Sequence, residues 1–208
     1  MTHRILWLSL LTGAVLLAEN VASQPMDKVA QAIAHVQQPK TTGDVIRNMK
    51  FAMEQGLLLE DKFYTPESAE KLLNMHGGIR DENPDSVAVD NTAPRDKAND
   101  FRLVGWRTGK QVVFAWEDLF ITTDPAPTMA EVQKILGPLI HYNGPFVFPG
   151  PGYNYSRELK GPGWVACILV DVPYPDRWPI TKDPVSSILI RQWTGKMPPE
   201  IAGKPSCP

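Results

Sequence analysis

The chain has few of the residues, and none of the short patterns, on which many activities depend. Its 208 residues include two cysteines and four histidines, and its formal net charge is −2. No run of five or more basic residues occurs, so the sequence offers little attraction for nucleic acid or an anionic membrane surface. A glycine-rich phosphate loop, a dinucleotide fingerprint and the Gly-x-Ser-x-Gly turn of esterases are all absent. These absences argue against nucleic-acid partners, nucleotide cofactors and serine-esterase chemistry.

The sequence also lacks a recognisable metal site. Its histidines are scattered, with no His-Glu-x-x-His pattern and no Cys/His group. Acidic residues gather between Asp81 and Asp90, but their spacing does not match a calcium-binding loop and Pro84 interrupts them. We therefore expect no metal and no other cofactor.

The N-terminus carries the most informative feature that is present. A basic start at Arg4 is followed by an apolar stretch over residues 5–18, and small residues at Ala22 and Ser23 precede Gln24. This pattern predicts a signal peptide over residues 1–23, with an apolar stretch too short to span a bilayer. We expect a periplasmic or secreted protein with no transmembrane span after cleavage. Residues 24–208 are enough for one domain with a single core.

Both cysteines, Cys167 and Cys207, lie in the last quarter of the chain. In an oxidising compartment such a pair predicts a disulfide, which would tether a Pro-rich tail over residues 194–208. The alternative is that Cys167, which lies in an apolar run over residues 165–170, is a small buried core residue with a free thiol.

Helical periodicity is concentrated in the first third of the chain. The patterns predict a helix over residues 26–36, a second from Asp44 as N-cap to Gly56, a third from Thr65-Pro66 to Gly77-Gly78, and a later helix from the capping box Thr128 to Glu131 up to Gly137-Pro138.

Strand patterns dominate the remainder. We expect a hairpin of residues 101–107 and 111–116 joined at Thr108-Gly109, two later strands over residues 164–172 and 185–193, and an irregular loop over residues 80–100 with one short strand at 87–89. The predicted class is α+β: N-terminal helices packed on an antiparallel sheet, with one later helix and a long loop rich in proline, glycine and aromatic residues over residues 141–163.

That long loop is the most distinctive segment of the mature chain. Proline fixes φ, and aromatic side chains lose little entropy on binding, so such a loop can present rings to a ligand. The hypothesis assigns the contact to Tyr142, Tyr153, Tyr155 and Trp164. The alternative is that these rings cover the open edge of the sheet as a small core of their own.

Acid/base chemistry has one candidate group. Glu117 and Asp118 follow an apolar strand that ends at Trp116, and a carboxyl beside aromatic surface can acquire a raised pKa. Together with His141 they would form a weak catalytic set. The alternative is the ordinary one, in which charged residues mark the point where a strand meets water.

Taken together, these patterns favour an exported, non-enzymatic binding protein of a bacterial-type cell envelope. Its partner would be a protein or a cell-wall glycan, bound by the aromatic loop. Two alternatives stay open: a small envelope hydrolase that acts on a wall polymer, and a periplasmic immunity protein.

Overall fold

The computed structural model describes residues 27–91, 100–123, 125–142, 152–173, 182–195 and 207. The predicted signal peptide and most of the predicted tail lie outside these ranges, as does the middle of the predicted aromatic loop. Within the described ranges, no helix is long and apolar enough to cross a membrane.

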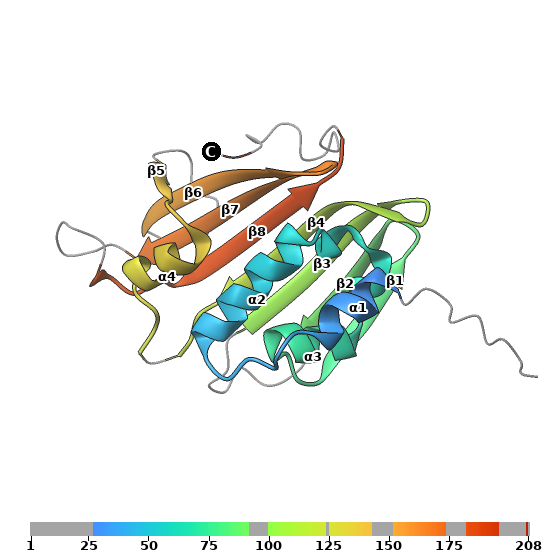
Figure 1. Cartoon of the computed structure of the whole chain (residues 1–208), viewed down its shortest axis with the longest axis horizontal. Helices are drawn as coiled ribbons and strands as arrows, with labels where there is room; N and C mark the ends of the chain where they lie inside the picture. Colours follow the sequence, from blue (N-terminus) through green and yellow to red (C-terminus); the bar gives the residue numbers. More distant parts are fainter. Residues whose placement is uncertain are drawn as a thin grey trace, which may run out of the picture.

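The fold is α+β, as predicted, with helices packed on one open antiparallel sheet (Figure 1). The helical segments are α1 (Lys28–Ala34), α2 (Thr42–Glu54), the short 3-10 turns η1 (Leu57–Leu59) and η2 (Asp61–Phe63), α3 (Pro66–Leu73) and α4 (Met129–Leu136). The strands are β1 (Gly78–Asn83), β2 (Ser86–Asn91), β3 (Asp100–Thr108), β4 (Gln111–Phe120), β5 (Ile140–Tyr142), β6 (Gly152–Gly161), β7 (Trp164–Pro173) and β8 (Ser187–Trp193). They form an eight-stranded sheet in the order β1-β2-β3-β4-β8-β7-β6-β5.

Helix starts follow local capping chemistry. Thr65 caps α3 with Pro66 at the first helical position, and Thr128 and Glu131 form the capping box of α4, so both predictions are confirmed. The predicted N-cap of α2 is wrong by three residues. Thr41 is the cap, and Asp44 is the third helical residue, whose carboxylate accepts the Thr41 amide at 3.0 Å.

The predicted end of α3 also needs correction. The helix ends at Leu73 because Asn74 adopts a left-handed conformation with φ of 57°. Glycine is the commonest residue in this capping conformation, and asparagine is the usual substitute for it. Gly77 and Gly78 therefore do not cap the helix, and Gly78 is the first residue of β1.

The β3–β4 hairpin is confirmed, and Gly109 in its turn has φ of 63°. In contrast, residues 80–91 of the predicted irregular loop are not irregular, because β1 and β2 occupy most of them, while residues 92–99 lie outside the described ranges. Pro84 lies in the turn between these two strands, where the Asn83 side-chain carbonyl accepts the amides of Asp85 and Ser86, both at 2.9 Å. Pro84 and the acids beside it, which predicted a loop, thus mark a tight turn and an exposed edge strand.

Residues 152–161 were predicted as loop and form β6 instead, paired along its length with β7. The short strand β5 pairs with β6 at the edge of the sheet. The loop prediction was wrong here because the glycines of β6, Gly152 and Gly161, lie only at its two ends. The residues between them are polar and aromatic, and they form a strand because they pair with the apolar strand β7.

One large apolar core lies between the helices and the face of the sheet that they cover (Figure 1). From α2, Ile46, Met49 and Met53 are completely buried in it. Their spacing of three to four residues places them on one stripe of the helix. From the sheet, alternate residues of the central strands, such as Leu103 and Ile190, point into the same layer.

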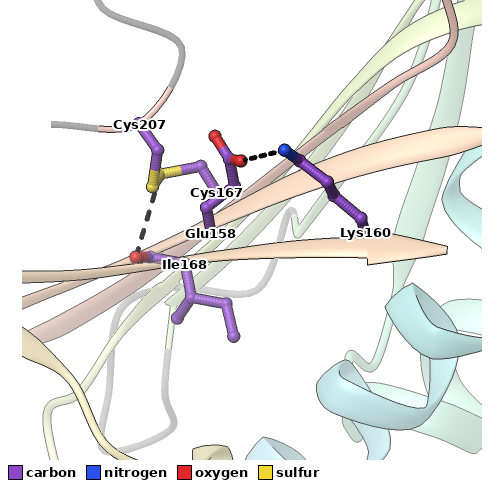
Figure 2. The surroundings of a disulfide bond; sticks show 5 residues. All are labelled: Glu158, Lys160, Cys167, Ile168 and Cys207. Atoms are coloured by element: carbon purple, nitrogen blue, oxygen red, sulfur yellow. Dashed lines mark hydrogen bonds and ion pairs between the residues drawn. A yellow bond between two sulfur atoms is a disulfide. The ribbon is translucent and has the colours of Figure 1, made fainter.

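The opposite face of the sheet carries a second, smaller core that includes the disulfide. Cys167 and Cys207 are bonded, with a Cα–Cα distance of 5.3 Å, which confirms the predicted pair. Figure 2 shows Cys207 reaching β7 from a separate segment, beside the Glu158–Lys160 ion pair of β6. The bond therefore ties the end of the chain to the middle of the sheet.

Close approach of Tyr64 to β3 generates a first prediction. A Cβ added at Gly105 would lie 2.7 Å from the Tyr64 ring and 3.0 Å from Val112. Gly105→Ala should lower the free energy of unfolding by about 1–3 kcal/mol, because a well-packed core cannot absorb an extra methyl group. Chemical denaturation measures this. The control is Gly43→Ala in α2, where the atom nearest to the added Cβ is 3.7 Å away and stability should stay the same or rise. Equal effects of the two variants would contradict the close packing of Tyr64 on Gly105.

The disulfide generates a second prediction. Its two cysteines are separated by 40 residues, and closing a loop of that size constrains the unfolded chain by up to about 4 kcal/mol. Adding dithiothreitol should therefore lower the melting temperature, and Cys207→Ser should reproduce the loss while making the protein insensitive to reductant. A wild-type melting curve unchanged by dithiothreitol would show that the bond contributes nothing to stability.

Candidate functional site

The predicted acids Glu117 and Asp118 do not lie at a strand end in contact with water. Both are inside β4, Glu117 with 0% and Asp118 with 4% of its surface exposed. Because neighbouring strand residues point to opposite faces, Glu117 faces the helical layer and Asp118 faces away from it. The interpretation of the pair as ordinary charges at the end of a strand is wrong.

The predicted catalytic set is also not brought together. His141 lies on the edge strand β5, where its ring is 5.4 Å from that of Tyr155. Four strand spacings separate β5 from β4, which is roughly 19 Å at 4.8 Å per strand. His141 therefore cannot exchange a proton directly with Glu117 or Asp118.

Glu117 nevertheless has unusual surroundings. Neither of its carboxylate oxygens has a hydrogen-bond partner among the described residues, and the same holds for Oε1 of Gln192 on the adjacent strand β8. The Gln192 amide donates instead to the Met53 carbonyl at the end of α2, at 2.7 Å. Burial raises the pKa of Glu117 to about 8, so the carboxyl is protonated at neutral pH. With no exposed surface it is a neutral core residue with no access to a substrate.

The aromatic side chains predicted to form a contact surface divide into two groups. Tyr155 is 7% exposed and belongs to the main core. Trp164 packs against the same core and over Gly161, and its ring lies 3.5 Å from where a Cβ of Gly56 would stand. Both therefore pack with the main core, and do not form a small core of their own over the sheet edge. Tyr142 and Tyr153 belong to β5 and β6, but their side chains lie outside the described part of the structure.

Sequence reasoning missed a cation within the second core. Arg191 of β8 is 8% exposed, and its guanidinium lies 6.0 Å from the centre of the Trp116 ring. Trp116 in turn stacks on Trp106. Burial lowers the pKa of Arg191, while the nearby Asp118 opposes that shift. This cluster is a packed layer on the sheet, and none of its residues lines the two hollows described below.

A hollow lies on the other side of the sheet, between α2 and α4. It has a volume of about 1000 Å³. Ala126, Pro127 and Ile135 give its lining partly exposed apolar surface, over a floor of Val45, Leu73 and Phe101, each at most 4% exposed. α2 and α4 lie side by side over the sheet (Figure 1), and the Lys50 ammonium joins them by donating to the Ile135 carbonyl at 3.0 Å. We call this hollow the α2–α4 cleft.

The charged side chains of the α2–α4 cleft are mainly basic. Lys40 and Lys134 are exposed and, within the described ranges, their ammonium groups have neither an ion-pair nor a hydrogen-bond partner. Arg47 pairs with Asp44 at 2.5 Å but keeps 57% of its side chain exposed. Among the described lining residues the one acid is Glu131, whose carboxylate accepts the Thr128 backbone amide and hydroxyl, and these hydrogen bonds lower its pKa. The cleft thus combines an apolar interior with two cations that are free to bind an anion.

Metal chemistry has no support in these side chains. Among the described residues, no group of three or more histidine, cysteine, aspartate or glutamate side chains is placed to hold an ion. The α2–α4 cleft can hold an organic ligand by apolar contact and charge. The Thr41 hydroxyl in its lining donates to the Asp44 carboxylate at 2.8 Å, and both groups are engaged in the capping box of α2.

The raised pKa of Glu117 predicts that the free energy of unfolding depends on pH. Its folded-state pKa of about 8 exceeds the ordinary value of 4.5, so the folded chain keeps a proton that the unfolded chain has released. Its contribution to stability is complete below pH 4.5 and is lost as the pH rises to about 8. The free energy of unfolding should fall across this window, with a slope of up to about 1.4 kcal/mol per pH unit from this group.

Glu117→Gln should remove that slope, measured by urea denaturation at several pH values. The matched control is Glu54→Gln on α2, whose side chain is 50% exposed, and its profile should run parallel to that of the wild type. Parallel profiles for wild type and Glu117→Gln would contradict a protonated buried carboxyl.

Comparison with known proteins adds no assignment for the α2–α4 cleft. No protein-family model, curated protein or solved structure matches the chain. Any function has to be argued from the chemistry of these residues.

Proposed function

We propose that this chain is an exported, non-enzymatic binding protein whose α2–α4 cleft takes a ligand with an apolar body and an acidic group. The observation that carries the proposal is the combination of apolar lining with two cations, Lys40 and Lys134, that have no partner among the described residues and lie on opposite walls. Lys40 precedes α2 and Lys134 belongs to the last turn of α4. A ligand carboxylate between these walls would gain both charge attraction and burial of its apolar part.

Export is supported by two independent features. The leader pattern of residues 1–23 is that of a signal peptide, and the Cys167–Cys207 disulfide is consistent with an oxidising compartment. Both features support a ligand that is located in the cell envelope or outside the cell.

The composition of the cleft favours a protein partner over a cell-wall glycan. Sugar rings stack on exposed aromatic faces, and the one aromatic residue in the described part of the lining, Phe101, is only 4% exposed. An acidic peptide segment with apolar side chains matches both the lysines and the apolar interior. We therefore propose a protein partner that presents such a segment.

Titration of isotope-labelled protein with the capped tripeptide acetyl-Glu-Leu-Glu-amide tests this proposal by NMR. Amide shifts should move around Val45, Phe101 and Lys134, and the analogue with Gln in place of Glu should cause much smaller changes. Lys134→Glu should weaken binding at least threefold, because it replaces an attraction of roughly 0.2–1 kcal/mol by a repulsion.

Lys110→Glu, at the exposed tip of the β3–β4 hairpin, makes the same charge change away from the cleft and serves as the control. It should leave the affinity close to that of the wild type. Shift changes centred elsewhere, or equal losses in the two variants, would contradict the assignment of the cleft.

A further inference from the structure

A second hollow adjoins the α2–α4 cleft on the other side of α2. It has a volume of about 610 Å³ and is lined by the segment before α2, including Val36 and Gln38, and by residues of α2 such as Phe51. Lys40 and Arg47 line both hollows. The two hollows therefore meet at these two cations, which form a basic ridge over the first half of α2.

Helical geometry explains the arrangement. Gly43, Arg47 and Lys50 line the α2–α4 cleft, whereas Asp44, Asn48 and Phe51 line the second hollow. Each set follows the spacing of three to four residues that defines one side of a helix. The two sets lie on adjacent sides of α2, so a ligand that enters both hollows must pass across the helix.

The ridge is equipped to bind a carboxylate in the middle of such a ligand. Arg47 uses one of its nitrogens for Asp44, and a guanidinium has five N–H donors in total. The Lys40 side chain has no partner among the described residues. One acidic side chain lying over α2 would therefore meet two cations at once.

The second hollow adds groups suited to a peptide backbone. Gln37 and Gln38 are exposed on its rim, and each carries an amide with both donor and acceptor atoms. Val36 and Phe51, both half-buried, provide apolar surface beside them. Amides next to apolar surface bind a main chain and its side chains together.

We infer that the occupant is an extended acidic peptide segment that straddles α2 and fills both hollows; this inference rests on the proposed function. A helix with its side chains is about 10–12 Å across, and an extended chain advances about 3.3 Å per residue. Crossing the ridge takes three to four residues, and anchoring on both sides brings the segment to about eight.

Calorimetry with two capped acidic peptides tests the inference: the tripeptide acetyl-Glu-Leu-Glu-amide and an octapeptide that extends it with alternating Leu and Glu. The octapeptide should bind at least tenfold more tightly. Gln38→Glu places a negative charge in the second hollow and should weaken the octapeptide at least threefold while leaving the tripeptide unchanged. Lys134→Glu should weaken both peptides.

The outcomes separate this inference from the proposed function. Equal affinities of the two peptides for the wild-type protein would overturn the straddling segment and leave the α2–α4 cleft as the site of a compact ligand. Binding of neither peptide would overturn both claims. Tight binding of polygalacturonate without binding of the octapeptide would overturn the peptide as occupant in favour of an anionic glycan.

Discussion

Contact between α2 and the sheet is the interaction on which the other features depend. Ile46, Met49 and Met53 bury one side of the helix completely, and at roughly 1.5–3 kcal/mol for each such side chain this stripe contributes much of the stability of the helical layer. The same contact fixes which side of α2 is left for solvent. Arg47 lies on that outer side, and α4 lies next to it, so the α2–α4 cleft follows from how the helices pack on the sheet.

The same interface holds the least expected residue of the molecule. Glu117 faces the helical layer from the middle of the sheet with no hydrogen-bond partner among the described residues, and a buried charge there would be far more costly than a neutral acid. At neutral pH the Glu117 carboxyl is protonated, so no charge is buried there. Arg191, on the opposite face, keeps its charge because Asp118 lies nearby and Trp116 offers an aromatic face. The central strands thus bury Glu117 on one face as a neutral acid, and Arg191 on the other face as a cation beside Asp118 and Trp116.

Features that depend on neighbouring residues in the chain could be predicted from the sequence, whereas most features that depend on contacts between distant residues could not. The caps at Thr65 and Thr128, the turn at Gly109 and the cysteine pair depend on neighbouring residues or on simple pairing, and each was predicted. The polar strands β1 and β6 were missed because they derive their stability from partner strands rather than from their own apolar pattern. For the site, a raised pKa was considered for Glu117 and Asp118 because of nearby aromatic surface, whereas the burial that raises the pKa of Glu117 was not predicted. The α2–α4 cleft was missed entirely, since Lys40 and Lys134 are far apart in the chain and only the docking of α4 beside α2 brings them to one hollow.

The central claim is that the basic, partly apolar hollows around α2 form the binding site of this protein. A crystal structure of the full chain grown with the acidic octapeptide tests it most directly. Our account predicts peptide density crossing α2 between the two hollows, with a carboxylate against Lys40 and Arg47. Density on the opposite face of the sheet, over Trp106 and Trp116, would contradict it.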